Sequence, residues 1–496
     1  MTLTAVARRS PLVPLALGGL MAFGQEPYGA PILMMLALVA VVWLFPDRSN
    51  PRAAFVFGWL VGRGYFLHSL QWIVSPFMVD VSRHGWMAPF ALLFLAAGIA
   101  LFWGLAFACA RLLSRKNSWA LILTLPAAEL LRAYVFTGFP WAMMSQALVD
   151  TQLGQMLAFV GPYVLNLWLV AIAAALGSRL LKGRAARAFQ ALVLLATLAM
   201  LALPPQGPAA LLSDNTIRLV QPNAAQRDKW DPDLIPVFFD RQLEFTGAAP
   251  EQGGQQPDLV LWSETAIPWL LNTADGALSA ISEAASGTPV ALGVQRSEAD
   301  GYYNSVVGLA ANGTIFARYD KHHLVPFGEY MPFKNWAERI GLHGLASQLG
   351  SGYRAGAGAA VLDFGTLGKA MPLICYEAVF PHDVNAAPER PDFMIHLSND
   401  AWFGKGAGPK QHLAQARMRA IEQGLPLARA ANTGISAMID PQGRILAMLE
   451  LNTAGFLDAR LPLAQAPTLY SRTGDKPFIL IILAALCLAA FRRVRV

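Results

Sequence analysis

A carboxylate, an ammonium and a thiol each follow a short apolar segment in this chain. Glu264 comes after Leu259-Val-Leu-Trp262, Lys321 is part of Arg318-Tyr-Asp-Lys321, and Cys375 ends Pro372-Leu-Ile-Cys375. Side chains at strand ends emerge at a sheet edge, where the three groups can meet. They are the parts that acyl transfer through a thioester requires: a general base, a nucleophile and a cation for the oxyanion. Spacing alone leaves an enzyme unproven, because a lone cysteine after a strand is more often a packing residue.

The chain has three cysteines, and their surroundings differ. Cys109 and Cys487 fall inside long apolar runs, where a thiol behaves as a small hydrophobic group. Only Cys375 lies in a segment of ordinary composition. No intramolecular disulfide is therefore predicted, and one thiol outside the apolar runs is left for chemistry.

The three reactive segments belong to a stretch, from about Thr216 to Ala466, with the composition of a soluble domain. Short β-branched runs alternate in it with helical patterns, which is typical of an α/β domain with helices packed on sheets. Asn312-Gly313 and 441–444 are predicted hairpin turns. The predicted strands are 217–220, 259–262, 290–293, 305–308, 372–375 and 393–397, and the predicted helices are 233–247, 275–285 and 409–424.

The rest of the chain is strongly apolar. Of its 496 residues, 55% are hydrophobic and only 14% are charged, whereas a soluble domain carries about 25% charged residues. These figures exclude intrinsic disorder, a collagen-like repeat and a small disulfide-stapled domain. Eight runs approach the ~20 apolar residues that a membrane helix needs. They lie at about 11–25, 30–46, 53–78, 86–112, 118–138, 157–180, 188–205 and 477–491.

The basic residues near these runs predict an orientation. With the N-terminus inside, the short outside loops hold Arg83 alone, and this positive-inside bias fixes the topology. It also accounts for the net charge of +6, which gives no reason to expect a nucleic-acid partner. The basic residues of the inside segments are Arg8, Arg9, Arg48, Arg52, Arg111, Arg115, Lys116, Arg179, Lys182, Arg184, Arg187, Arg492, Arg493 and Arg495.

The chain therefore divides into three predicted parts. Residues 1–205 form a transmembrane bundle of seven helices, 216–466 an outside catalytic domain, and 477–496 a closing transmembrane helix with a basic cytoplasmic tail. The first run could instead be a cleaved signal peptide, but no small-x-small site precedes Gln25, which favours its retention. Inside the bundle, Glu129 and Arg132 are three residues apart and are expected to pair on one helix face.

In their order along the chain, the segments of Glu264, Lys321 and Cys375 resemble the Glu-Lys-Cys signature of the nitrilase (carbon–nitrogen hydrolase) superfamily. Set between membrane spans, they are similar to the apolipoprotein N-acyltransferase family of the Gram-negative inner membrane. The resemblance covers nearly the whole chain and departs from the pattern at no signature position. Its longest stretches are 321–330, 137–141 and 398–403.

The resemblance implies an α-β-β-α sandwich in the periplasm, together with a membrane α-helical bundle of about eight helices. It implies Glu264 as general base, Lys321 as oxyanion stabiliser and Cys375 as nucleophile. Further residues that it implies are Glu329, which would position the lysine; Tyr376 and Glu377, which follow the nucleophile; and Trp230 and Asn304, which would contact substrate. Apolar loops are expected to keep water from a thioester; the candidates are Trp402-Phe403 and 326–352, with Phe327, Phe333 and Trp336.

The implied reaction is a ping-pong N-acylation, the last step of lipoprotein maturation. Cys375 would take an acyl chain from a phospholipid, with phosphatidylethanolamine the expected donor. The thioester would pass that chain to the α-amine of the S-diacylglyceryl-cysteine of an apolipoprotein. The expected enzyme is a monomer in the inner membrane with both termini cytoplasmic. No cofactor, metal or nucleic acid is predicted, because the sequence has no CxxC, HExxH, P-loop or dinucleotide-binding motif.

Two other functions stay open at this point. A membrane-tethered amidase or nitrilase acting on small C–N substrates would use the same three residues. A transporter or receptor would only bind a ligand with its outside domain. The transporter would be expected to carry inverted repeats and broken helices in its bundle, and the sequence gives no sign of them.

Overall fold

The structure is a computed structural model that describes residues 10–48, 50–114, 118–177, 183–202, 207, 209–250, 254–332 and 352–494. Contacts within the chain divide it into two compact units. The first consists of residues 1–207 and 468–496, and the second of residues 208–467.

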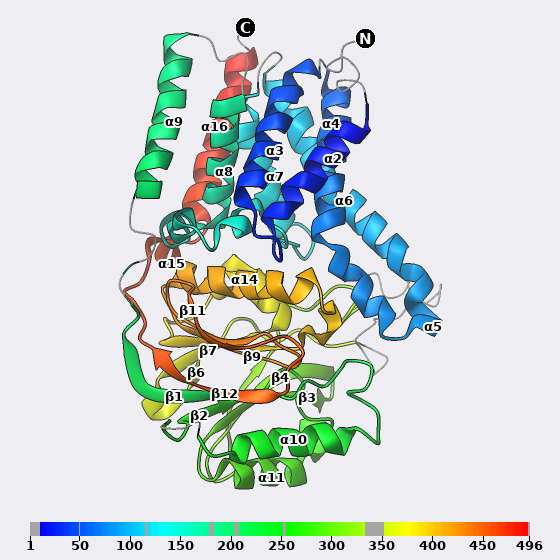
Figure 1. The fold of residues 1–496 in the computed structure, drawn as a ribbon, viewed down its shortest axis with the longest axis vertical. Helices are drawn as coiled ribbons and strands as arrows, with labels where there is room; N and C mark the ends of the chain where they lie inside the picture. Colours follow the sequence, from blue (N-terminus) through cyan, green and yellow to red (C-terminus); the bar gives the residue numbers. More distant parts are fainter. Residues whose placement is uncertain are drawn as a thin grey trace. The chain divides into compact units, whose positions relative to one another are not determined.

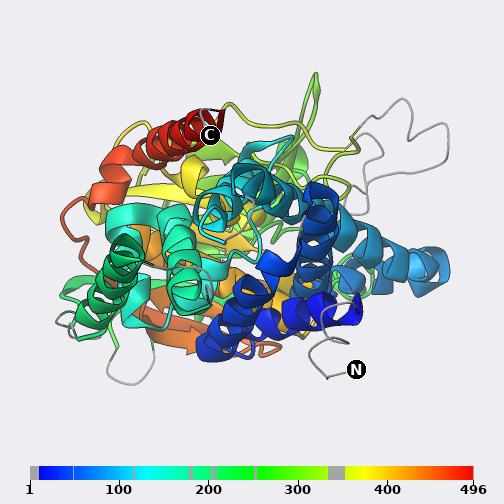
Figure 2. The same cartoon turned by 90° about the horizontal axis from the view of Figure 1, so that it is seen from above.

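The first unit is helical, and its longer helices run beside one another (Figures 1 and 2). Each of the eight apolar runs predicted from the sequence overlaps a helix. One run is divided, because α4 ends at Ser69 and a 3-10 helix over Gln71–Met78 follows it. The helices are α2 (Leu12–Met21), α3 (Pro31–Leu44), α4 (Pro51–Ser69), α5 (Val81–His84), α6 (Ala88–Leu113), α7 (Leu121–Tyr134), α8 (Leu157–Gly177), α9 (Arg184–Ala202), α15 (Leu469–Thr473) and α16 (Lys476–Val494).

Two helical stretches among the described residues, Val81–Leu113 and Gln152–Gly177, are long and apolar enough to cross a membrane. Three shorter apolar helices lie at Leu12–Gly24, Pro31–Asp47 and Ala186–Ala202. The count of eight spans therefore stays a prediction. Of the basic residues behind the predicted orientation, Arg8, Arg9, Arg115, Lys116, Arg179, Lys182 and Arg495 lie outside the described residues.

A buried ion pair sits inside the helical unit, as the spacing on α7 predicts. Arg132 Nη2 lies 2.6 Å from Glu129 Oε2, and both side chains are almost fully buried. Trp103 on α6 donates its indole N–H to Glu129 at 2.7 Å. Arg132 also donates to the carbonyl oxygens of Phe139 and Trp141. The pair thus ties the segment 137–141 to α7, which satisfies its charges without contact to lipid.

The second unit contains two six-stranded sheets. The first has the strand order β12 (Gly455–Pro462), β1 (Leu212–Gln221), β2 (Leu259–Leu261), β3 (Val290–Glu298), β4 (Gly301–Leu309) and β5 (Ile315–Asp320). The second has the order β11 (Ile445–Leu449), β10 (Ser436–Ile439), β9 (Leu427–Ala431), β8 (Phe393–Ser398), β7 (Lys369–Ile374) and β6 (Leu362–Asp363).

Helices cover the outer face of each sheet, which gives the α-β-β-α sandwich that the resemblance implies (Figure 1). The helices α10 (Ile235–Gly247) and α11 (Asp275–Ala285) pack on the first sheet through a cluster around Trp262 and Ile281. The helix α14 (Ala407–Gln423) packs on the second through Leu413 and Ala416. The core between the sheets joins residues such as Leu261 and Ile395. Each predicted strand and helix lies within or overlaps one of these elements.

Both sheets have three parallel strands at their centre. In the first sheet β1, β2 and β3 are parallel, and in the second β7, β8 and β9. The register pairs Ile374 with Leu397 and Ser398 with Ala431, so the residues after β7, β8 and β9 leave the second sheet side by side. Carboxyl ends of parallel strands are where α/β sheets place ligand and catalytic groups.

Candidate active site

Glu264 lies just past the carboxyl end of β2 and is 6% exposed. Its Oε1 accepts a hydrogen bond from Nδ2 of Asn304 at 2.7 Å and lies 3.4 Å from Nζ of Lys321. Its Oε2 accepts the backbone N–H of Asn399 at 2.9 Å. Donors on both oxygens fix the orientation of the carboxylate, as a general base requires.

Lys321 follows β5 directly and is 1% exposed. Its Nζ lies 2.8 Å from Oε1 of Glu329 and 3.4 Å from Oε1 of Glu264. Burial alone would lower the pKa of Lys321, but the two carboxylates outweigh it and hold that pKa above its usual range. The lysine is therefore a fixed cation, suited to stabilising an oxyanion and unsuited to accepting a proton.

Glu329 and Asn304 hold this arrangement together. Glu329 accepts the backbone N–H of Val325 on Oε2 at 2.8 Å, which leaves Oε1 for the lysine. Asn304, on β4, donates to Glu264 at 2.7 Å and to Glu329 at 3.2 Å through the same Nδ2. Its Oδ1 is buried and has no hydrogen-bond partner among the described residues. Asn304 thus bridges the two glutamates and keeps one acceptor oxygen available.

The turn that carries Glu264 packs against Gly293 on β3. A Cβ at this position would lie 2.6 Å from Cα of Glu264, from the carbonyl oxygen of Ser263 and from the backbone nitrogen of Thr265. The contact is with backbone, so a side chain here must displace the turn. Glycine at 293 is therefore what lets the turn of Glu264 approach the sheet.

Gly293→Ala is expected to lower kcat about 100-fold while the protein stays folded, because a displacement near 1 Å costs about that much. The measurement is the catalytic turnover of the purified variant beside a thermal unfolding curve. Gly276→Ala is the matched control, since nothing lies within 4 Å of a Cβ added there on α11. Wild-type kcat in Gly293→Ala would contradict the prediction.

Cys375 begins a 3-10 turn, η9 (Cys375–Val379), and does not end β7 as the sequence predicts. Its φ of +49° is left-handed, a conformation that a strand cannot contain and that costs energy in a residue with a side chain. Burial and the charges of Glu264 and Asp400 raise the pKa of the thiol well above its usual range, against Lys321 and a hydrogen bond with Ser398. The thiol is therefore protonated at neutral pH and needs a base to become a nucleophile.

Glu377, two residues past the cysteine, joins the two loops that carry Lys321 and Cys375. Its Oε1 accepts the backbone N–H of His322 at 2.9 Å and the hydroxyl of Tyr319 at 2.6 Å. Its Oε2 accepts the backbone N–H of Ile374 at 2.8 Å. One fully buried carboxylate therefore sets the spacing between the residues before the cysteine and those after the lysine.

Glu377→Gln is expected to lower the free energy of unfolding by about 1–3 kcal/mol, because one buried donor then loses its acceptor. Activity should fall as well, since the two loops are no longer held in register. Chemical denaturation and transfer kinetics measure both effects. Glu389→Gln is the control: its ion pair with Lys369 is about half exposed, so its removal should cost less than about 1 kcal/mol. Equal losses in the two variants would contradict the assigned role.

The remaining residues predicted from the sequence have varied surroundings. Tyr376 is buried and packs its ring edge-on against Phe380. Trp402 and Phe403 lie in η10 (Asp400–Phe403), where Phe403 packs on the core between the sheets. Phe327 is 62% exposed. Phe333 and Trp336, also predicted to cover the site, lie outside the described residues.

Trp230 lies beside a buried lysine that the sequence analysis did not single out. Nζ of Lys229 is 5.4 Å from the centre of the Trp230 ring. Lys229 donates to the carbonyl oxygen of Glu264 at 3.2 Å and to Oγ1 of Thr265 at 3.0 Å. Burial lowers its pKa to about 8, with Glu264 opposing that shift. Both residues line a small pocket with Phe238, Gln242 and Thr265, next to Glu264 in the chain.

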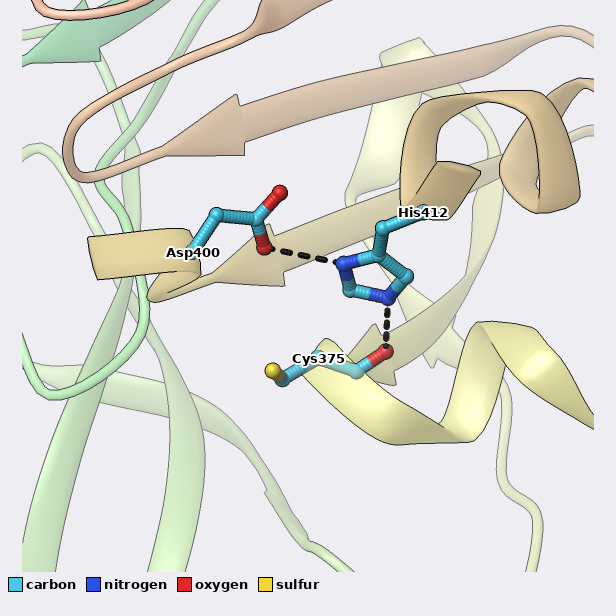
Figure 3. Close-up of side chains that lie close together, drawn as sticks. All are labelled: Cys375, Asp400 and His412. Atoms are coloured by element: carbon cyan, nitrogen blue, oxygen red, sulfur yellow. Dashed lines mark hydrogen bonds and ion pairs between the residues drawn. The ribbon is translucent and has the colours of Figure 1, made fainter. Parts of the chain in front are cut away.

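A polar network behind Cys375 was also missed. Asp400 and His412 lie beside the cysteine, and His412 bonds both Asp400 and the carbonyl oxygen of Cys375 (Figure 3). Arg429 on β9 completes the network with a bond to Asp400. Asp400 stands in the segment 398–403 already noted for its resemblance. No local sequence pattern marks His412 or Arg429 as a site residue. His412 lies on the helix α14 and Arg429 in the strand β9.

Ligand atoms of Cys375, Asp400 and His412 lie within 4.8 Å of one another, close enough to consider a metal ion. The chemistry of the cluster does not favour one. Both ring nitrogens of His412 already face protein acceptors, and the guanidinium of Arg429 occupies the second oxygen of Asp400. Hydrogen bonds among the described residues therefore account for the grouping.

Comparison with known proteins gives two family matches and a set of close relatives. Residues 216–469 match the carbon-nitrogen hydrolase model, and residues 17–175 match the model of the apolipoprotein N-acyltransferase N-terminal domain. Proteins named apolipoprotein N-acyltransferase are similar over most of their length. The one from Rhodopseudomonas palustris is 36% identical over 97% of this chain and 95% of its own. The one from Sinorhizobium fredii is 37% identical over 91% and 90%.

Solved structures that resemble this chain cover about half of it. A CN-hydrolase superfamily protein from Xanthomonas campestris has 21% sequence identity and a TM-score of 0.37, covering 54% of this chain and 97% of its own. An amidase from Nesterenkonia sp. has 21% identity and a TM-score of 0.36, covering 52% and 94%.

Proposed function

The chain belongs to the apolipoprotein N-acyltransferase family, and on this premise we propose that Cys375 carries the acyl group between two lipid substrates. Membership in the family makes the protein an acyltransferase that N-acylates lipoproteins. The observation that supports the proposed route is the buried Glu264-Lys321-Glu329 network, which acts electrostatically on a thiol at a left-handed turn.

In the first half-reaction, Glu264 takes the proton of the Cys375 thiol and the thiolate attacks the ester carbonyl of a phospholipid. Lys321 faces the negative charge that develops on the carbonyl oxygen. When the tetrahedral intermediate collapses, the C–O bond breaks and Glu264 returns its proton to the leaving alkoxide. The products are a lysophospholipid and an acyl thioester on Cys375.

In the second half-reaction, the α-amine of a diacylglyceryl-cysteine attacks the thioester. Glu264 accepts a proton from the amine, the C–S bond breaks, and the proton passes to the departing sulfur, which restores the resting thiol. The free Oδ1 of Asn304 supplies an acceptor for the second N–H of that amine, next to the base. This supports the substrate contact implied for Asn304.

We assign phosphatidylethanolamine as the donor, the S-diacylglyceryl-cysteine of an apolipoprotein as the acceptor, and a monomer as the working enzyme. A helical unit favours such substrates, because withdrawing an acyl chain from the bilayer costs about 0.8 kcal/mol per CH₂. Fusion to membrane helices lets the chains remain in hydrocarbon while the reacting groups meet the thiol. Trp230, Trp402 and Phe403 are the proposed apolar contacts near the site.

We also propose an inner-membrane topology of eight spans, with both termini in the cytoplasm and the catalytic domain in the periplasm. The positive-inside pattern of the sequence supports it. In a Cys109→Ala/Cys487→Ala background, Ser286→Cys should react with an impermeant maleimide in intact spheroplasts, and Arg492→Cys only after permeabilisation. Both positions are exposed. The opposite labelling pattern would reverse the orientation.

Trapping the acyl-enzyme tests the proposed chemistry. Purified protein in detergent is mixed with a labelled phosphatidylethanolamine and analysed by intact mass. Wild type should gain one acyl chain that hydroxylamine removes and that a diacylglyceryl-cysteine peptide discharges, and Cys375→Ala should gain none. Cys375→Ser is the supporting control, since its ester resists discharge. No adduct on folded wild type, with a competent phospholipid, would refute the donor and redirect the search to small amides.

A further inference from the structure

The backbone carbonyl of the proposed nucleophile is held by two histidines. Nε2 of His396 and Nε2 of His412 each lie 3.0 Å from the carbonyl oxygen of Cys375. Both rings are fully buried. His396 comes from β8 and His412 from α14, so two separate elements converge on one oxygen. This oxygen belongs to the residue with the left-handed φ, and the two bonds help to hold that strained conformation.

The protonation of His396 follows from its partner. Its Nδ1 lies 2.6 Å from Nη1 of Arg429, and a guanidinium can only donate. Nδ1 of His396 must therefore accept, which leaves its single proton on Nε2 for the carbonyl of Cys375. Burial lowers the pKa of His396, and the neighbouring Arg429 lowers it further. His396 is a neutral donor.

His412 faces two acceptors instead. Its Nδ1 lies 2.8 Å from Oδ1 of Asp400 and 3.3 Å from Nη2 of Arg429, so the carboxylate is the nearer partner, and its Nε2 points at the carbonyl oxygen (Figure 3). Burial would raise the pKa of Asp400, but Arg429 and His412 outweigh it and hold that pKa below its usual range, so the carboxylate is ionised. A neutral imidazole has one N–H and would leave a lone pair facing one of these oxygens. Only a doubly protonated ring donates to both.

We propose that His412 is a buried imidazolium that positions Cys375 and supplies a second cation, beside Lys321, for its thiolate. A ring nitrogen of His412 lies within 4.8 Å of Sγ of Cys375. An opposite charge within about 4–6 Å favours the ionised form of an acid. Two cations thus lie near the nucleophile. Lys321 pairs with Glu264 and Glu329, and His412 pairs with Asp400. His412 touches no reacting atom and is a positioning residue.

The charges around His412 come from several elements. Asp400 in η10 and Arg429 on β9 form a fully buried pair with Nη2–Oδ2 at 2.5 Å, which leaves Oδ1 of Asp400 facing the ring of His412. Neutral His396 on β8 lies edge-on, with ring centres 5.1 Å apart. Along α14 itself, Arg419 and Glu422 pair with each other at 2.6 Å. Asp400 is therefore the anion that holds the proton on Nδ1 of His412.

The inference rests on Cys375 being the nucleophile proposed above, and it is tested without either lipid substrate. The reagent is iodoacetamide, and peptide-level mass spectrometry follows alkylation of Cys375 from about pH 6 to pH 10. His412→Gln keeps a donor for the carbonyl at the position of Nε2 but removes the charge. His396→Gln is the matched control, because it keeps the same kind of bond and removes no charge.

His412→Gln is expected to slow alkylation at each pH below the thiol pKa, by about 10-fold or more at pH 7.5, as the loss of a nearby cation requires. His396→Gln should lose much less of that rate, because it removes no charge. Superimposable pH profiles for the two folded variants would overturn the proposal. A failure of lipid transfer in wild type would refute the proposed function. The alkylation rates of the two variants could still be compared, because they need no lipid substrate.

A second measurement uses the unaltered protein, in case His412→Gln does not fold. Carbon-13 is placed at cysteine carbonyls and nitrogen-15 in histidine rings, and solid-state dipolar recoupling selects rings bonded to a cysteine carbonyl. Cys109 and Cys487 lie on α6 and α16 of the helical unit, whereas Cys375, His396 and His412 belong to the other unit. At about pH 8 one selected ring should be neutral and the other doubly protonated. Two neutral rings would overturn the proposal.

Discussion

Glu264→Gln is expected to slow acylation of Cys375 by about 1,000-fold, within the range that a positioned general base contributes. The glutamine keeps the size of the side chain but cannot take the thiol proton. Its amide group also faces donors at Asn304 Nδ2 and Lys321 Nζ, where the carboxylate of the wild type accepts. The rate is measured as the appearance of the acyl adduct in a single turnover.

Alkylation of Cys375 is a second measurement on Glu264→Gln, and its rate is expected to rise where the acylation rate falls. After burial, the charge of Glu264 is the largest factor that raises the pKa of the Cys375 thiol. Removing that charge should lower the thiol pKa, so iodoacetamide should alkylate Cys375 faster at pH 8 while acyl transfer is lost. Loss of both reactions would indicate a displaced cysteine, and acylation within tenfold of wild type would show that Glu264 is not the base.

Lys321→Met is expected to abolish transfer by 1,000-fold or more, because the only cation bonded to both Glu264 and Glu329 among the described residues is lost. Removing one oxyanion donor costs about 100- to 1,000-fold, and the thiol also loses a charge that favours its ionisation. Alkylation of Cys375 should therefore slow in this variant, the reverse of Glu264→Gln. Unchanged transfer by a folded Lys321→Met protein would exclude the lysine from the mechanism.

The same change should destabilise the fold by about 3–5 kcal/mol, the usual cost of breaking a buried ion pair from one side. Glu264 and Glu329 would then face each other through Asn304 without a cation. One of the two carboxyls must take a proton, so its folded pKa lies above the unfolded value and the defect grows as pH rises. Unfolding at pH 5 and pH 8 measures this dependence. Lys321→Met/Glu329→Gln should recover stability without recovering activity, and Lys369→Met is the exposed control.

The positions of the three central residues near strand ends were predictable from the sequence because they rest on local patterns. A short apolar run marks β2 and β7, and the residue types that follow each run show which groups stand near the sheet edge. β2 and β5 belong to the first sheet and β7 to the second, so only the packing of the two sheets brings Cys375 to Glu264 and Lys321. The layers of the sandwich, in contrast, followed from strands alternating with helical patterns.

The hydrogen-bond partners of these residues could not be predicted from local sequence patterns. The bond from Asn304 to Glu264 crosses from β4, and the backbone N–H of Asn399 reaches Glu264 from the other sheet. Gly293 looks in the sequence like any glycine in an apolar run. Its importance appears only in the distance from its missing Cβ to the turn of Glu264. Such contacts depend on how the two sheets face each other, which no periodicity encodes.

The sequence by itself determined which reactive groups stand near the end of each strand and the family of the chain, because these depend on residue type and order. The tertiary structure decided which groups of the site are protonated. His412 belongs to an ordinary helical pattern, and only the packing of α14 on the second sheet brings its ring between Asp400 and the carbonyl of Cys375. Protonation follows from which acceptors surround a buried ring, and those acceptors come from elements far apart in the chain.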